Sequence, residues 1–208
     1  MKKFLIWLLE PIRLFIFRLQ WRKINSFNET RAVNRFHLDN VSIGRNTYGP
    51  LEVLYDAGNG KLSIGSYCSI ADNVKFFLGG GHNYKRISTF PFQTKTYMGL
   101  HLLKRDEYID IVVEDDVWIG YDVIVLAGSK IGKGSVVGAR SIVSGEIPPY
   151  SIYVGNKVIK QRFPENVISK IKDIDFSKVE HNIGDKYQSY CTQELNESNV
   201  DEVLRSFV

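Results

Sequence analysis

A six-residue repeat runs through the second half of the chain and limits its possible folds more than any other feature. An α-helical stripe would recur every three to four residues and a half-buried strand every two, so neither accounts for a step of six. The step fits a short strand followed by a corner, with three such units closing one coil. The first position of each unit is aliphatic in six successive units: Val113, Ile119, Val125, Ile131, Val137 and Val143.

Other positions of the repeat carry the residues that stacked coils need. We expect the first and fifth positions to point inward, and glycine at the second position to occupy a corner with an unusual φ angle. Stacked coils would hydrogen-bond as parallel strands about 4.8 Å apart. The sequence thus predicts an all-β core, a left-handed parallel β-helix. The fifth position reads Val117, Val123, Ser129, Ser135, Ser141 and Ile147; the glycines are Gly120, Gly132 and Gly138; an earlier block keeps the step with Ile64, Ile70 and Phe76.

The repeat is interrupted between its two blocks. The distance from Phe76 to Val113 is 37 residues, which is not a multiple of six. A long loop without repeats inside a compact domain is usually functional. We therefore expect a basic amphipathic helical segment over residues 1–32, a β-helix domain over 33–155 with an excursion loop over 77–110, and a C-terminal helical cap over 156–208.

Charge and cysteine content exclude several classes of protein. The net charge of +4 is concentrated in residues 1–32, which carry +5, so the rest of the chain carries −1. A nucleic-acid-binding domain would spread a basic face over its fold, so no nucleic acid is expected as a partner. The two cysteines, Cys68 and Cys191, form neither a CxxC motif nor a disulfide framework, and this favours a cytoplasmic protein.

The first 25 residues raise the question of membrane contact. The apolar run 4–9 is interrupted by Glu10 and Pro11, whereas a spanning helix needs about 20 apolar residues and a secretory signal needs a longer apolar stretch with a cleavage site. A basic, aromatic-rich helix remains. It would either pack on its own β-helix or on a neighbouring subunit, or lie peripherally at the inner face of the membrane through residues 1–25.

Three motifs point to a family. They are Gly-Gly-Gly-His-Asn at 79–83, Ser-Thr-Phe-Pro-Phe at 88–92 and Asp-Asp-Val-Trp-Ile-Gly at 115–120. With the hexapeptide tract, they resemble the xenobiotic and polysaccharide O-acetyltransferases of the hexapeptide superfamily, over residues 20–175. The resemblance implies acetyl-CoA as acyl donor and a homotrimer with active sites between adjacent β-helices. The sequence departs from the family pattern in a shortened loop at 155–158 and in Gly81, where an acidic residue is common.

His82 is the expected general base. Acyl transfer to a hydroxyl needs a base that is neutral near pH 7, and histidine, with a pKa of about 6.5, suits that task. Three glycines place His82 on a loop leaving a rigid scaffold, and the resemblance puts it on the family's catalytic histidine. We expect no metal, because a catalytic zinc site needs three protein ligands and no second histidine lies near His82 in sequence. The other histidines are expected to be structural: His37, His101 and His181.

The two substrates have separate candidate residues. By resemblance, Trp118 would line the pantetheine groove, and the two lysines after the last coil would meet the phosphates of coenzyme A. For the acceptor we expect aromatic residues before the first clear coil and after His82, since aromatic faces stack on sugars and on apolar antibiotics alike. The donor candidates are Trp118, Tyr121, Ala139, Ser144, Lys157 and Lys160; the acceptor candidates are Tyr48, Tyr55, Asp56, Tyr84, Phe90 and Phe92.

The favoured function is transfer of an acetyl group from acetyl-CoA to a hydroxyl of a sugar or polysaccharide precursor, by direct attack and without a covalent enzyme intermediate. An antibiotic O-acetyltransferase and a sugar N-acetyltransferase remain alternatives within the same chemistry. A non-catalytic β-helix scaffold is the alternative of a different class. The sequence is compatible with each of these acceptors.

Overall fold

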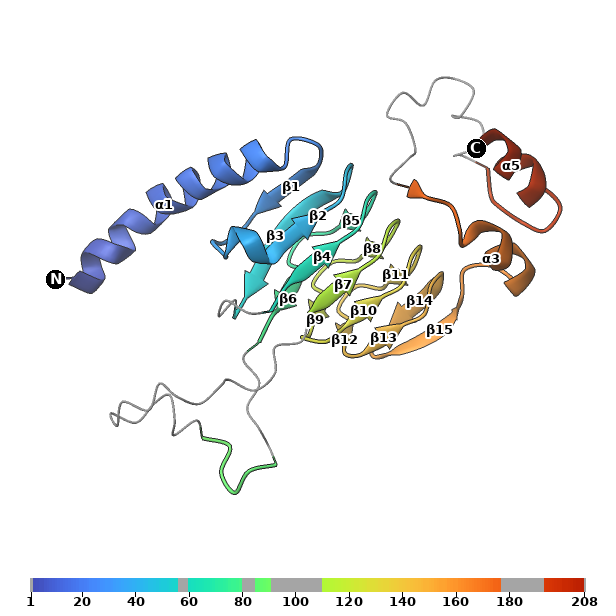
Figure 1. Cartoon of the computed structure of the whole chain (residues 1–208). Coiled ribbons are helices and arrows are strands. Elements are labelled where there is room, and N and C mark those ends of the chain that lie inside the picture. The colour runs from blue at the N-terminus through green and yellow to red at the C-terminus, as the bar shows by residue number, and fades with distance from the viewer. Residues whose placement is uncertain (1, 56–59, 80–84, 91–109, 177–192, 208) are drawn as a thin grey trace.

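The hexapeptide units fold into short strands stacked along one axis (Figure 1). The structure, a computed structural model, describes residues 2–55, 60–79, 85–90, 110–176 and 193–207. Strands of the coils are two to seven residues long, because a corner interrupts each face. They are β2 (Val41–Ile43), β3 (Tyr48–Leu54), β4 (Leu62–Ile64), β5 (Ser69–Ile70), β6 (Lys75–Phe77), β7 (Ile111–Val113), β8 (Trp118–Ile119), β9 (Ile124–Val125), β10 (Lys130–Ile131), β11 (Val136–Val137), β12 (Ile142–Val143), β13 (Glu146–Ile147) and β14 (Ser151–Val154), with a 3₁₀ turn η1 (Leu38–Asn40) before β2.

Three parallel sheets form the faces of a triangular prism. Sheet A runs β3-β5-β8-β11-β14, sheet B runs β2-β4-β7-β10-β13, and sheet C runs β3-β6-β9-β12. Strand β3 begins in sheet A and ends in sheet C, because it bends around a corner. The five strands of sheet B mark five successive coils. The predicted fold class, a parallel β-helix with an all-β core, is confirmed.

The inward positions predicted from the repeat are also confirmed. Every first-position residue from Val113 to Val143 and every fifth-position residue from Val117 to Ile147 is at most 2% exposed. The earlier block is buried in the same way, at Ile64, Ile70 and Phe76. Serine is tolerated inside because each hydroxyl donates to a backbone carbonyl, as Ser135 Oγ does to the oxygen of Pro148 at 2.9 Å.

The second-position glycines serve a different purpose from the one expected. Their φ angles do not lie in the left-handed region. They are required because the next coil passes too close for a side chain: a Cβ on Gly65 would lie 2.6 Å from the backbone nitrogen of Asp115, and one on Gly132 would lie 2.5 Å from that of Pro149. The expectation of an unusual φ at this position is therefore wrong, and close packing of successive coils is the reason for glycine there.

Left-handed backbone falls instead at the fourth position of the repeat. Asp116, Asp122 and Arg140 have φ angles of 57–60°, and Gly128 and Gly134 occupy equivalent corners with φ of 82° and 67°. Asn and Asp accept this conformation more readily than other non-glycine residues. Each corner therefore turns at a residue that the sequence analysis did not single out.

The N-terminal helix covers the first coil. Helix α1 (Lys2–Ile24) leads into β1 (Glu29–Ala32), which pairs with the start of β3 at the edge of sheet A (Figure 1). Trp21 is 1% exposed, packs edge-on against Phe36 at 5.2 Å between ring centroids, and donates its indole N–H to Thr30 Oγ1 at 3.1 Å. Packing of α1 on its own β-helix is therefore present. None of the described helices is long and apolar enough to span a bilayer.

The other end of the β-helix is closed by a strand and two helices. Strand β15 (Lys157–Gln161) folds back antiparallel on β14 and so pairs the last edge of sheet A. Helices α3 (Glu165–Ile171) and α5 (Val200–Phe207) fall where the sequence predicts helices. They form a second apolar cluster with Tyr150 of the last coil. Strand β15 lies within the segment expected to be a helical cap.

Candidate functional site

A row of outward side chains crosses sheet A, and it holds three of the candidate residues. Residues paired in register on neighbouring strands point to the same side of a sheet. The pairing continues from Tyr48 through Trp118 to Lys160, over six strands from β3 to β15. At about 4.8 Å per step, the row is roughly 24 Å long. We call it the sheet A row: Tyr48, Ser69, Trp118, Val136, Ile152 and Lys160.

The sheet A row combines apolar contact in its middle with charge at one end. Trp118 is 57% exposed, so the wide indole face is free to contact a ligand in the described structure. Val136 and Ile152 next to it are half-buried and form an apolar floor. Lys160 and Lys157 lie on the exposed strand β15 at the far end. An extended ligand with an apolar arm and an anionic end would match this order.

The corner between sheets A and C runs beside this row and carries two more candidates. We call it the A/C corner, residues 71–74, 120–123 and 138–141. The backbone N–H of Asp122 donates to the oxygen of Asp72 at 3.1 Å, and the N–H of Arg140 donates to the oxygen of Tyr121 at 2.8 Å. Tyr121 and Ala139 therefore stack in successive coils. Ser144 lies in the turn between β12 of sheet C and β13 of sheet B, away from the row and the A/C corner.

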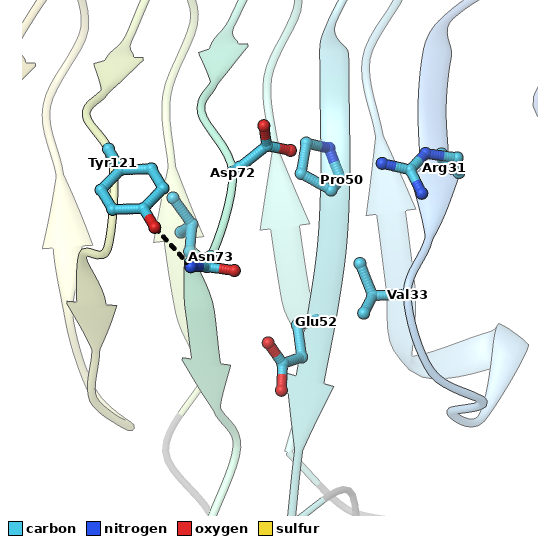
Figure 2. A pocket seen from close by; sticks show the side chains of 8 residues that line it. Arg31, Val33, Pro50, Glu52, Asp72, Asn73 and Tyr121 are labelled. Atoms are coloured by element: carbon cyan, nitrogen blue, oxygen red, sulfur yellow. Dashed lines mark hydrogen bonds between the residues drawn. The ribbon is translucent and has the colours of Figure 1, made fainter.

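A polar pocket opens at the A/C corner near the first coils (Figure 2). Its volume is about 410 Å³. Asn73 donates from Nδ2 to the hydroxyl of Tyr121 at 2.8 Å, which fixes the phenol at one side of the pocket. The carboxylates of Glu52 and Asp72 also line it, and Arg31 stands at the opposite end (Figure 2). The full lining is Arg31, Val33, Pro50, Glu52, Asp72, Asn73, Val74 and Tyr121.

Most residues of this pocket were not predicted from the sequence. Among its lining residues, only Tyr121 was a candidate. Asn73 has φ of 62° at the fourth position of its hexapeptide, a position typical of corners, so the polar residue there has a local structural reason. Arg31 lies on β1, outside the hexapeptide tract. Only the pairing of β1 with β3 brings it to the corner, and no sequence pattern indicated that pairing.

The acceptor candidates are only partly within the described residues. Tyr55 is 61% exposed and stacks on Phe77, the last residue of β6, with ring centroids 5.6 Å apart. Phe90 is 53% exposed, and its N–H donates to Ser88 Oγ. Four predicted site residues lie outside the described residues: His82, Asp56, Tyr84 and Phe92.

The acidic residues 114–116 bind groups outside their own strand and corner. Asp115 accepts the backbone N–H of Ser66 at 2.7 Å, and Glu114 accepts that of Lys133 at 2.8 Å. Asp116 forms an ion pair with Arg162 at 3.3 Å. Burial raises the pKa of Asp116, and the charge of Arg162 partly opposes that rise. These contacts are structural and favour no catalytic role for the run.

Cys68 is buried and unreactive near neutral pH. It is 0% exposed at an inward fifth position, and its thiol donates to the oxygen of Glu114 at 3.1 Å. Burial raises the pKa of the Cys68 thiol to about 12, so the nucleophilic thiolate is absent near neutral pH. Cys68 therefore offers no covalent route for acyl transfer.

We expect Cys68 to resist alkylation until the protein unfolds. The folded pKa of about 12 lies above the ordinary thiol pKa of 9.0, so stability from this group is complete below pH 9 and is lost as pH rises toward 12. In a Cys191→Ser background, a thiol reagent at pH 9 should react only after denaturant is added. Rapid labelling of the native protein would show that the thiol is accessible.

The chain is similar in sequence and fold to known proteins. Residues 110–145 match the family described as "Bacterial transferase hexapeptide (six repeats)". A chloramphenicol acetyltransferase of Klebsiella aerogenes is 39% identical over 123 residues, which is 56% of this chain and 59% of that protein. A Lysinibacillus sphaericus protein named "Probable macrolide acetyltransferase" is 35% identical over 136 residues, 62% of this chain and 76% of that protein.

The chain belongs to the hexapeptide-repeat acetyltransferase family. It spans about three fifths of the length of the chloramphenicol acetyltransferases that it matches. A solved structure of a hexapeptide-repeat acetyltransferase from Vibrio cholerae superposes with a TM-score of 0.51 at 23% identity, covering 67% of this chain and 76% of that one, and it supports the fold alone. The resemblance stated from the motifs is thus confirmed for the family.

Proposed function

We propose that the protein transfers an acetyl group from acetyl-CoA to a hydroxyl of a sugar or polysaccharide precursor. Family membership supports the class of reaction. The observation that carries the proposal is the sheet A row, which offers an apolar floor beside Trp118 and cationic Lys160 at its end. The pantetheine arm of acetyl-CoA would lie along that floor, with its phosphates toward Lys157 and Lys160.

The proposed chemistry is a direct attack in which His82 moves one proton. The acceptor oxygen attacks the thioester carbonyl carbon while His82 takes the hydroxyl proton. The carbon–sulfur bond then breaks, and the coenzyme A thiolate leaves with the proton returned from His82. No enzyme nucleophile is needed because the thioester is already activated, which fits the buried and protonated state of Cys68.

The pocket at the A/C corner supports a sugar as the acceptor. Carboxylates such as Glu52 and Asp72 accept hydrogen bonds from several hydroxyls at once, and Tyr121 supplies a face for a sugar ring. An apolar antibiotic would offer no hydrogen-bond donors to these carboxylates. Acetylation of a sugar amine remains the second candidate, because the same pocket would accept hydrogen bonds from an amine.

Removal of Lys160 should weaken binding of acetyl-CoA. Loss of a hydrogen bond to a charged group costs about 1.5–3 kcal/mol, so Lys160→Ala should raise the Kd for acetyl-CoA by about tenfold or more. Calorimetric titration measures this Kd. Lys130→Ala is the matched control, because Lys130 lies on sheet B and pairs with Glu114 and Glu146 at 3.5 and 3.6 Å. Equal effects of both substitutions would argue against a phosphate contact at Lys160.

We also propose that the protein is a homotrimer in the cytoplasm. Aliphatic side chains stand outward on the coils, including Ile142 at 48% and Val112 at 36% exposure, and a neighbouring β-helix would cover them. The free, buried thiol of Cys68 suits a reducing compartment.

Light scattering at micromolar concentration should give three times the chain mass of 23.8 kDa. Charged substitution at an outward aliphatic position, Ile142→Asp, should shift the mass toward the monomer, because burying an unpaired carboxylate opposes association. A monomer in the unsubstituted protein would contradict the trimer.

A further inference from the structure

Helix α1 has two apolar faces, and only one of them is covered. Phe17 and Trp21 pack into the β-helix core. On the opposite side, five large apolar residues spaced three or four apart follow one face of the helix and are 49–61% exposed. We call this face the outer stripe: Leu8, Ile12, Phe15, Ile16 and Leu19. A second apolar face that stays exposed on such a helix is typical of a site that binds a protein or a membrane.

The charges around the outer stripe are basic. Arg13 and Lys23 are exposed on α1, whereas the guanidinium of Arg22 donates to the carbonyl oxygens of Asn28 and Thr30. Over residues 8–24, Glu10 is the one acidic residue, and Arg35 of the β-helix holds it at 2.8 Å. The exposed part of the described helix therefore offers cations beside apolar side chains.

We propose that the outer stripe docks α1 on an anionic lipid surface, parallel to the plane of the membrane. An interfacial helix buries its apolar face at the boundary of head groups and acyl chains, while basic residues attract acidic lipids. Helix α1 has this arrangement, and no described helix is apolar enough to span. A second copy of α1 fits less well, because Glu10, the one acidic residue over 8–24, is paired with Arg35, so two copies would offer only cations to each other.

The position of α1 in the fold makes docking compatible with acetyl transfer. It lies across the β1 end of the β-helix, remote from β14 and β15 where the sheet A row ends (Figure 1). In a cyclic trimer of parallel β-helices, all three outer stripes would lie at the same end, which would multiply a weak attachment. The inference does not depend on the proposed reaction.

Vesicle flotation tests the proposal on the full chain. The wild type should float with vesicles of phosphatidylglycerol and phosphatidylcholine at low salt. It should not float with vesicles of phosphatidylcholine alone. Ile12→Gln combined with Phe15→Gln and Leu19→Gln should lower the partition coefficient at least tenfold. Arg13→Gln with Lys23→Gln should lower it about fivefold for each charge. Ile24→Gln is the matched control: Ile24 is 52% exposed on the same helix but off the stripe.

Three results of the flotation would overturn the proposal. They are absence of the wild type from the anionic vesicles, equal flotation of the stripe variant, and equal binding to neutral and anionic vesicles. A smaller assembly of the stripe variant by light scattering would instead show that a second copy covers the stripe, and would also overturn it. Acetyl transfer to a water-soluble acceptor, measured on the same variants, should be unchanged, so failure of docking is distinguished from failure of the proposed function.

Discussion

Replacing His82 with alanine should lower the rate of acetyl transfer by about 10²–10⁴, because removal of a general base typically costs that much. The effect should fall on kcat, since the donor contacts proposed for the sheet A row do not involve His82. The thermal midpoint should stay within a few degrees of the wild type, because His82 falls in the stretch between Phe76 and Val113 where the six-residue repeat is interrupted. Steady-state kinetics and thermal denaturation measure the two effects.

His37→Ala is the matched control for this substitution. His37 is exposed and precedes the 3₁₀ turn η1, so its loss should change the transfer rate less than threefold. Near wild-type transfer by the His82→Ala protein would contradict the proposed mechanism. Inactivation by Cys191→Ser would contradict it equally, since it would point to a covalent acyl-enzyme.

Replacing Trp21 with alanine should destabilise the protein by about 3–5 kcal/mol. Trp21 is among the largest fully buried side chains, and it closes the first coil through its contact with Phe36. Its loss leaves a cavity and removes the hydrogen bond to Thr30. At about 2–4 °C per kcal/mol, the thermal midpoint should fall by about 10 °C at fixed protein concentration.

Phe15→Ala is the matched control, because it removes an aromatic side chain of the same helix that is not buried in the core. Phe15 is 61% exposed, so truncation should change the free energy of unfolding by less than about 0.5 kcal/mol. A loss below 1 kcal/mol for Trp21→Ala would show that α1 does not close the coil. A loss for Phe15→Ala as large as that for Trp21→Ala would show that the outer stripe is itself covered.

The sequence predicted the β-helix because one physical requirement recurs in every coil. Positions one and five must fill a narrow interior, so Val113 to Ile147 repeat aliphatic and small residues, and the repeat can be read without a structure. The reason for glycine at Gly65 or Gly132 could not be read in this way. It depends on how closely the next coil passes, which is a distance between residues far apart in sequence.

The site was less predictable than the fold. Trp118 and Lys160 were named by resemblance, but their common row became apparent only from strand pairing across sheet A. The pocket residues Arg31 and Glu52 carried no motif, because β1 and β3 are brought to the A/C corner by tertiary pairing. The outer stripe could not be predicted for another reason. Both faces of α1 are apolar, so the sequence does not show which face is buried and which is exposed.

The most direct test of the account is acetyl transfer itself, followed by mass spectrometry of the acceptor and by assay of released coenzyme A. The protein is incubated with acetyl-CoA and a panel of sugars, amino sugars and chloramphenicol, and acetyl-CoA binding is measured by calorimetry on the same preparation. We expect binding of acetyl-CoA, one acetyl group gained by a sugar hydroxyl for each thiol released, and no acetylated enzyme. Absence of acetyl-CoA binding, or a stable acetyl group on the protein, would contradict it.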